Sequence, residues 1–359
     1  MVWLWGGFVA LVLALLALDL GVFHRQAHVV SFREALGWSV VWITMGLAFA
    51  VFVGFAYDGH WFGLGIVPDP VDGTPLDGPA AALKYLTGYV VEKSLSVDNI
   101  FVIAMIFSFF GVPAVYQHRV LFWGILGALL MRGAMIAVGA RLIAEFHWIL
   151  YIFGVFLILT GVKMLVVKPQ GEDLSRNPVV RLARRLLPVT DRFHGGHFVV
   201  RAGSAASIEP ATPGAVAARD PAVAAARAGA WMLTPLALAL ILVETTDLIF
   251  AVDSIPAIFA ITGDTFLVFT SNVFAILGLR SLYFALAELL ASLRYLKVAL
   301  AVVLMVVGGK MLAAGWLQEV LGGHFHFYLL AIILLSLAIG AGASLLFPPR
   351  SKSPAPQGA

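Results

Sequence analysis

The chain has 359 residues, of which 61% are hydrophobic and 12% are charged, and its formal net charge is +3. A soluble domain carries roughly 45–50% apolar and about 25% charged residues, so this composition excludes an ordinary soluble fold, a disordered chain and a nucleic-acid-binding protein. The absence of cysteine excludes disulfides, thiolate metal sites and cysteine nucleophiles.

Nine apolar segments are long enough to cross a bilayer, which requires about 20 mostly apolar residues per helix. The sequence therefore predicts an all-α, polytopic membrane protein. The first segment lacks a basic leading region and a small-residue cleavage site, so we expect a retained helix and not a signal peptide. The segments are Trp3–Leu20, Leu36–Ala56, Leu83–Phe109, Val120–Ala140, Phe146–Val167, Met232–Thr262, Phe266–Leu289, Leu296–Ala313 and Phe327–Phe347.

Lysine and arginine gather in alternate loops, above all in the long stretch from residue 168 to residue 230. The loop before Leu83 instead carries four aspartates between residues 58 and 77. Under the positive-inside rule, this asymmetry places the N-terminus outside and the C-terminus in the cytoplasm of a cell-membrane protein. That orientation requires an odd number of helices, and nine satisfies it.

The spans and loops divide the chain into six units. We expect neither the loop at 168–230 nor the tail at 348–359 to bury enough apolar surface for a separate folded domain. Residues 202–230 are rich in Ala, Gly and Pro, a composition typical of a flexible segment. The units are two N-terminal helices (1–56), three helices (83–167), a basic cytoplasmic loop (168–230), three more helices (232–313), the last helix (327–347) and a disordered tail (348–359).

The two groups of three helices share a pattern. EKSLSVDNI at 92–100 matches DLIFAVDSI at 247–255, because each holds two carboxylates six residues apart, followed by an amide or hydroxyl residue and isoleucine. Because each group has an odd number of helices, the second copy must be inverted across the membrane. Inverted repeats are typical of secondary transporters, whose binding site lies near the midplane. Two further pairs follow in the same order: Arg132 with Arg280, and Lys163 with Lys310.

Ten charged side chains fall inside the predicted helices, where each costs about 2.5–3.5 kcal/mol to insert. We expect the carboxylates to line a site, because isolated ion pairs would not require two matched acid pairs. For the two arginines, the sequence favours ion pairs that hold helices together. For the lysines, a counter-charge in the site and snorkelling to the interface are both open. The ten are Glu92, Lys93, Asp98, Arg132, Lys163, Glu244, Asp247, Asp253, Arg280 and Lys310.

Helical geometry groups some of these residues. At about 100° per residue, Glu92 shares a face with Asn99, and Asp247 shares a face with Ser254. The second acid of each pair lies about 120° away, so one ion cannot readily contact both acids of a straight helix. Pro256 lacks a backbone donor, so we expect a kink or an unwound turn there that frees carbonyl oxygens for a cation.

The expected metal ligands are all oxygen atoms, and such sets suit hard divalent cations such as Mn²⁺, Mg²⁺ or Ca²⁺. No P-loop, nucleotide fingerprint or nucleophile triad occurs, so we expect a gradient-driven process, with no enzyme activity and no bound cofactor. The expected partners are a divalent metal ion and the lipid bilayer, with membrane proteins at the 168–230 loop as an open alternative. The ligands are Glu92, Asp98, Asn99, Glu244, Asp247, Asp253 and Ser254.

Five longer motifs extend these observations: LDLGVFHRQAHVVSFREALGWSVVWI (18–43), EKSLSVDNIFVI (92–103), PVTDRFHGGHFVVR (188–201), VETTDLIFAVDSIPAIFAIT (243–262) and TSNVFAILGLRSLYF (270–284). Together they resemble the TerC/Alx family of integral membrane proteins over nearly the whole chain, and the Ala-rich stretch at 202–230 departs from it. The resemblance implies a manganese exporter of the LysE-like transporter superfamily, often labelled for tellurium resistance. The family's acidic helix residues correspond to Glu92, Asp98, Glu244, Asp247 and Asp253.

We therefore expect export of Mn²⁺ by alternating access, coupled to inward proton movement, through a midplane carboxylate site. Lys93, Lys163 or Lys310 would occupy the carboxylates when no metal is bound. Because tellurite is an anion, which a carboxylate-lined path repels, any effect on tellurite tolerance would be indirect. The alternatives are a transporter for Ca²⁺ or another divalent cation, and a membrane scaffold or insertion factor.

Overall fold

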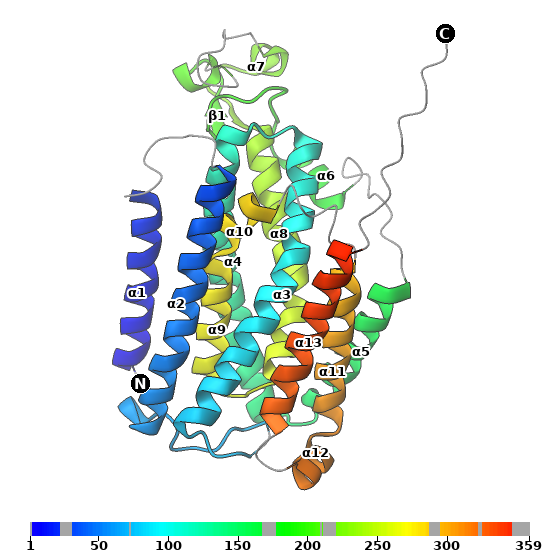
Figure 1. Cartoon of the computed structure of the whole chain (residues 1–359). Coiled ribbons are helices and arrows are strands. Elements are labelled where there is room, and N and C mark those ends of the chain that lie inside the picture. The colour runs from blue at the N-terminus through cyan, green and yellow to red at the C-terminus, as the bar shows by residue number, and fades with distance from the viewer. Residues whose placement is uncertain are drawn as a thin grey trace.

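The structure is a computed structural model that describes residues 2–21, 31–71, 73–166, 177–208, 210, 220–286, 295–321 and 325–346. Most of these residues form helices that run side by side in one bundle (Figure 1). α1 begins at the lower end of the bundle in Figure 1, and α13 ends toward the upper end. The predicted tail at 348–359 lies outside the described residues.

Each predicted span corresponds to a helix or a helix pair. α2, α4, α5, α8 and α13 are each long and apolar enough to cross a membrane, and the bent pair α9–α10 adds a sixth candidate. α1, α3 and α11 run alongside them, and α12 (Ala314–Leu321) follows α11 (Figure 1). The nine are α1 (Val2–Gly21), α2 (Phe32–Asp58), α3 (Gly78–Phe110), α4 (Ala114–Glu145), α5 (Ile149–Val166), α8 (Pro235–Phe259), α9–α10 (Thr265–Leu277 and Leu279–Leu286), α11 (Leu296–Leu312) and α13 (Phe325–Leu346).

The helix ends coincide with capping residues in the sequence. Asp77 accepts a hydrogen bond from the backbone N–H of Ala80 at 2.9 Å at the start of α3. Asp264 does the same for Phe266 of α9, also at 2.9 Å. Gly111 ends α3 with a φ of +64°, a conformation that glycine adopts without steric cost. Capping residues in the sequence therefore mark the start of α3, the end of α3 and the start of α9.

The helix break lies in a different span from the predicted one. α8 is continuous through Pro256, which sits in its last turn, so the backbone hydrogen bond that proline cannot donate is lost close to the end of the helix. The break occurs instead at Gly278, where α9 and α10 meet at 41°. A Cβ at Gly278 would lie 2.7 Å from Lys93 Nζ and 2.9 Å from Trp42 Cβ, so glycine permits a close approach of α2 and α3.

The two predicted three-helix groups pack in a reciprocal way. α3 contacts α9, and α8 correspondingly contacts α4. The equivalent helices also contact each other, as α3 with α8, α4 with α9, and α5 with α11. α3 and α8 run in opposite directions in Figure 1. This pattern is unchanged when the two groups are exchanged, as an inverted repeat requires. The exact boundaries of the repeats stay a prediction.

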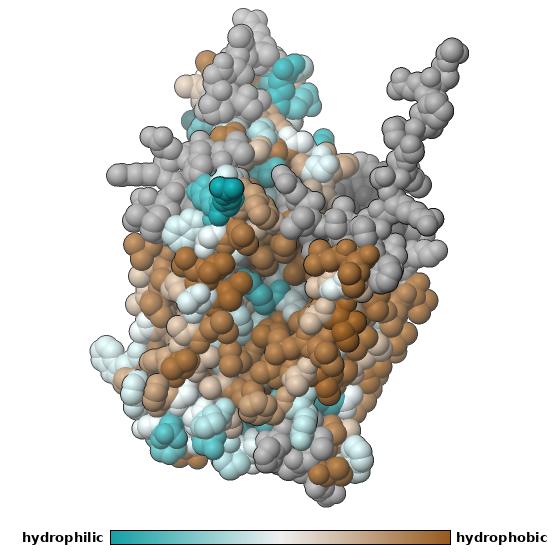
Figure 2. Space-filling view, viewed as in Figure 1, coloured by the Kyte–Doolittle hydropathy of each residue, from teal (hydrophilic) through white to brown (hydrophobic). Residues whose placement is uncertain are grey.

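Large apolar side chains are exposed around the middle of the bundle. Figure 2 shows them as a broad brown area on one face, with hydrophilic side chains gathered toward the two ends. Val51, Leu159 and Leu335 are examples from three different spans. Soluble monomers rarely expose contiguous apolar patches larger than a few hundred Å². The exposed middle is therefore the lipid-facing surface of a multi-pass membrane protein.

A small ordered unit, here called the cap, stands at the upper end of the bundle in Figure 1 and comprises residues 188–208 and 220–234. It contains η3 (Ala205–Ile208), α7 (Pro221–Ala225) and an antiparallel pair of strands, β1 (Val199–Arg201) and β2 (Trp231–Leu233). Val200, Ala202 and Met232 form its buried core. The described parts of the 202–230 stretch contain η3 and α7, and the flexibility expected for this stretch stays a prediction.

Asp220 holds the cap together. Its Oδ1 accepts a hydrogen bond from the backbone N–H of Ala222 at 2.9 Å, which caps α7. Its Oδ2 accepts one from the backbone N–H of Arg192 at 2.9 Å and lies 3.1 Å from His194 Nε2. Burial opposes ionisation of this carboxyl, but the donors prevail and hold the pKa of Asp220 below its ordinary value.

We expect Asp220→Ala to destabilise the cap by about 1–2 kcal/mol at neutral pH, because the side-chain hydrogen bonds to the N-terminus of α7 are lost. Since the folded-state pKa is lowered, this contribution is fully present above the unfolded pKa of about 3.9 and is lost as pH falls through the folded value. The difference in hydrogen-exchange protection of cap amides between variant and wild type should be larger at pH 7 than at pH 3. A difference that does not shrink from pH 7 to pH 3 would contradict this assignment.

The connection between α2 and α3, which includes η1 (Trp61–Gly63), covers the opposite end of the bundle. Asp69 Oδ2 accepts hydrogen bonds from Lys84 Nζ at 2.8 Å and from Thr262 Oγ1 at 2.5 Å. Its Oδ1 accepts one from the backbone N–H of Gly263 at 2.9 Å. The Asp69 and Lys84 side chains are both fully buried. These bonds join the connection to α3 and to the turn between α8 and α9.

Candidate functional site

A buried group of polar side chains, here called the central cluster, lies where α3, α4, α8 and α9 meet. Five of its members are no more than 5% exposed, and the side chain of Asp247 is 14% exposed. Buried polar groups at this depth need partners from neighbouring helices. The members are Glu92 and Asn99 of α3, Arg132 of α4, Asp247 and Ser254 of α8, and Asn272 of α9.

Arg132 connects the members of the central cluster. Its Nε donates to Asp247 Oδ2 at 3.2 Å and its Nη2 donates to Asp247 Oδ1 at 3.0 Å, a bidentate pair. Its Nη1 forms an ion pair with Glu92. The same nitrogen donates to Ser254 Oγ at 3.2 Å and to Asn272 Oδ1 at 3.0 Å. One guanidinium therefore joins the first acid of each predicted repeat.

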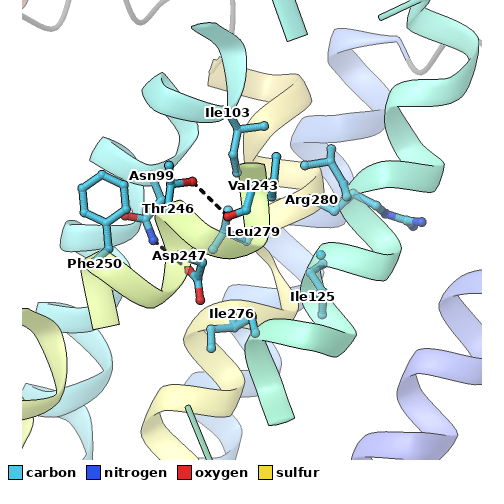
Figure 3. A pocket seen from close by; sticks show the side chains of 13 residues that line it. Asn99, Ile103, Ile125, Val243, Thr246, Asp247, Phe250, Ile276, Leu279 and Arg280 are labelled. Atoms are coloured by element: carbon cyan, nitrogen blue, oxygen red, sulfur yellow. Dashed lines mark hydrogen bonds between the residues drawn. The ribbon is translucent and has the colours of Figure 1, made fainter. Parts of the chain in front are cut away.

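A cavity of about 30 Å³ lies beside Asp247. Its polar lining includes Asn99, Thr246 and Asp247, and most of its other walls are apolar. Asn99 Nδ2 donates to Asp247 Oδ1 at 3.3 Å, and the guanidinium of Arg280 is directed away from Asp247 (Figure 3). A water molecule needs about 10–15 Å³ on this measure, so the cavity can admit about two particles of that size.

Glu244 stands beside the central cluster. It lies one turn before Asp247 on α8 and interacts electrostatically with it. Its carboxylate packs against Gly127 of α4, where a Cβ would overlap it. Its Oε2 is buried without a hydrogen-bond partner among the described residues. When ionised, the carboxylates of Glu92, Asp247 and Glu244 exceed the charge of Arg132 by two negative charges.

The second acid of each predicted repeat lies away from the central cluster. Asp98 interacts electrostatically with Lys297 at the start of α11. Asp253 accepts a hydrogen bond from Thr160 of α5 at 3.4 Å and interacts electrostatically with Lys163. Each of these acids thus faces the third helix of the other repeat. The structure places both acids among helix-joining contacts.

The lysines expected to neutralise the carboxylates lie elsewhere in this conformation. Lys93 Nζ donates to the carbonyl oxygen of Ala275 at 3.1 Å, because its helix position points toward α9. Lys310 Nζ donates to the carbonyl oxygen of Ala260 at 2.6 Å. Lys163 is exposed on α5. Arg132 occupies the place that was predicted for a lysine.

Within the described ranges, no three His, Asp or Glu side chains are placed to hold a metal ion together. Arg132 explains this, because its guanidinium lies between Glu92 and Asp247. Two residues of the site were not predicted. Asn272 had a visible signal, as an amide in an otherwise apolar span, whereas the need for glycine at 127 depends on the approach of Glu244 and leaves no trace in the sequence.

Comparisons with known proteins agree with this architecture. The family model described as "Integral membrane protein TerC family" matches residues 77–352. "Uncharacterized membrane protein STKORF319" of Myxococcus xanthus is 48% identical over 308 residues, which cover 86% of this chain and 82% of the relative. "Putative membrane-bound redox modulator Alx" of Escherichia coli K12 is 45% identical over 310 residues, covering 86% and 85%. No solved structure matches the chain. The chain therefore belongs to the TerC family of integral membrane proteins.

Proposed function

We propose that this protein exports a divalent metal cation, Mn²⁺, from the cytoplasm through the central cluster and Glu244. The observation that carries the proposal is the charge of this region. Apart from Arg280, which lines the cavity but directs its guanidinium away from Asp247 (Figure 3), three carboxylates and one guanidinium, when ionised, leave two negative charges in excess inside a membrane-spanning bundle. Uncompensated charge at this depth is costly, and one divalent cation would neutralise it.

The groups around the cavity suit a hard cation. Asp247 supplies a carboxylate to the cavity lining, and Asn99 and Thr246 add amide and hydroxyl oxygens to it. Oxygen ligands of this kind favour Mn²⁺, Mg²⁺ and Ca²⁺ over softer metals. The choice of Mn²⁺ within this group rests on the family resemblance of the sequence motifs.

Arg132 would set the affinity of the site. A site with three carboxylates and no internal cation would bind a divalent ion too tightly for rapid release, whereas transport needs binding weak enough for the ion to leave. The guanidinium of Arg132 reduces the negative charge and holds Glu92 and Asp247 in place between turnovers. In this proposal, protons taken up from outside compete with the cation for the carboxylates and release it.

Cells that lack their own manganese exporter provide the test. Expression of the wild-type protein should lower cellular Mn²⁺ several-fold after a manganese load, as measured by elemental analysis. In inside-out membrane vesicles, an imposed proton gradient should drive Mn²⁺ uptake, and excess Ca²⁺ or Mg²⁺ should compete weakly. Unchanged Mn²⁺ in both assays would refute manganese export and favour a scaffold or insertion role. Strong competition by Ca²⁺ would reassign the cation.

The printed name of the E. coli relative connects that protein with redox modulation. The 359 residues of this chain contain no cysteine, so none of them can take part in thiol–disulfide exchange. We therefore propose that any influence of this protein on cellular redox balance follows from the metal that it moves.

A further inference from the structure

A short helix on the flank of the bundle has a surface that metal transport does not use. α6 (Pro178–Leu186) begins at Asn177, whose side chain accepts a hydrogen bond from the backbone N–H of Val179 at 2.9 Å. It packs against α8 near the end of the bundle that carries the cap (Figure 1). Under the positive-inside rule, this is the end predicted to face the cytoplasm.

The residues of α6 divide into two halves around the helix axis. At about 100° per residue, the apolar residues occupy one half and the three arginines occupy the other. The bundle covers only part of the apolar half, since Val180 and Ala183 are buried. Leu182 and Leu186 are 56% and 71% exposed. An amphipathic helix with basic residues opposite its apolar half is typical of helices that lie at a membrane surface. The arginines are Arg181, Arg184 and Arg185.

An apolar groove of about 260 Å³ runs between α6 and the start of α8. Leu182 and Leu186 line one side of it, and Leu233 and Ile241 line the other. Ile241 lies six residues into α8, or roughly 9 Å along its axis at 1.5 Å per residue. The groove therefore extends from the end of the bundle toward the middle of the membrane-spanning part of α8.

Positive charge stands next to this groove. Arg184 and Arg185 are exposed, and neither forms an ion pair with any residue that the structure describes. Arg184 stands three residues before Leu187 and Arg185 stands three residues after Leu182, each about 60° around the helix axis from that groove-lining residue. Each arginine therefore lies at an edge of the apolar half, within reach of a group bound at the groove's rim. The inner leaflet of cell membranes carries anionic lipids, whose phosphate attracts nearby arginine side chains.

We propose that α6 and this groove form a binding site for an anionic phospholipid of the cytoplasmic leaflet. One acyl chain lies in the groove between Leu186 and Ile241, and Arg184 and Arg185 bind the phosphate. The site is independent of the transported ion. It anchors α6 at a fixed depth in the membrane.

Native mass spectrometry of the full-length protein, titrated with phosphatidylglycerol or phosphatidylcholine of equal chain length, tests this proposal. The wild type should retain phosphatidylglycerol at least about tenfold more strongly, and Arg184→Gln/Arg185→Gln should lose about that factor for phosphatidylglycerol alone. Leu186→Ser should weaken binding of both lipids, because it removes groove contact and keeps the charge.

The matched control is Arg33→Gln/Arg141→Gln, which removes the same charge from exposed positions on α2 and α4. It should bind both lipids as the wild type does. Equal retention of the two lipids by the wild type would overturn the proposal. So would equal losses in the α6 double variant and the control, or displacement of the lipid by free glycerol phosphate, which would indicate a phosphate site without an acyl-chain groove.

Discussion

Replacing Asp247 by asparagine should lower metal export roughly a hundredfold, because removing one charge from a buried, charge-paired site costs about 2–5 kcal/mol. Asp247 is the carboxylate that lines the cavity, and it also receives both hydrogen bonds of the Arg132 fork. The variant should still fold, since Arg132 keeps its ion pair with Glu92. Export from cells, measured at equal membrane expression, is the assay.

The same helix offers a matched control. Asp253→Asn makes the identical change six residues along α8, at a side chain that contacts Thr160 and not the central cluster. Asp98→Asn does so on α3. Both should retain export within about fivefold, because neither side chain contacts the central cluster and partly exposed ion pairs contribute about 1 kcal/mol or less. An equal loss of export in all three variants would show that export depends on Asp98 and Asp253 as strongly as on the central cluster.

Arg132→Gln should have the largest effect on stability. It leaves Glu92 and Asp247 facing each other in the bundle without their shared cation, and breaking a buried ion pair from one side costs about 3–5 kcal/mol. Added Mn²⁺ should restore much of this stability, because a ligand that binds only the folded state stabilises it by mass action. Thermal unfolding in detergent across a Mn²⁺ series measures both effects. Export should be slower than in the wild type, because the cation is released less readily.

Two further variants separate charge from folding in this experiment. Glu92→Gln/Arg132→Gln removes one charge of each sign, and it should recover stability without metal and respond less to Mn²⁺. Arg141→Gln removes an exposed arginine of the same helix, and it should behave as the wild type. If Mn²⁺ shifted the unfolding of Arg132→Gln no more than that of the wild type, Arg132 would be a structural residue and not one that tunes metal affinity.

Most of the spans could be predicted from the sequence, because a run of about 20 apolar residues has few alternatives in a membrane protein. α11 begins at Leu296, as predicted, and ends one residue before the predicted limit. The break was misplaced because Pro256 is a visible helix breaker, whereas the bend at Gly278 depends on how closely α2 and α3 approach it. Such an approach depends on tertiary packing, so it cannot be predicted from the sequence of one segment.

The site was partly predictable for a similar reason. Helical periodicity groups Glu92 with Asn99 and Asp247 with Ser254, and these four side chains do meet in the central cluster. The angle of about 120° between the two acids of each pair directs Asp98 and Asp253 to other helices. Periodicity gives the face of a residue on its own helix but not the helix that it meets. The choice of Arg132 over the lysines as the central cation therefore required the three-dimensional packing.

The Asp69 network has a consequence for the way this molecule can move. Its hydrogen bonds cross from the first predicted repeat, through Lys84, to the turn that joins α8 and α9 in the second. A motion that separates the repeats at this end would break the hydrogen bonds that Thr262 and Gly263 donate to Asp69, whereas Asp69 would keep its ion pair with Lys84. A buried donor that loses its partner costs about 1–3 kcal/mol. Water must therefore reach Thr262 and Gly263 as the helices part. Hydration and opening at this end of the bundle are a single cooperative event.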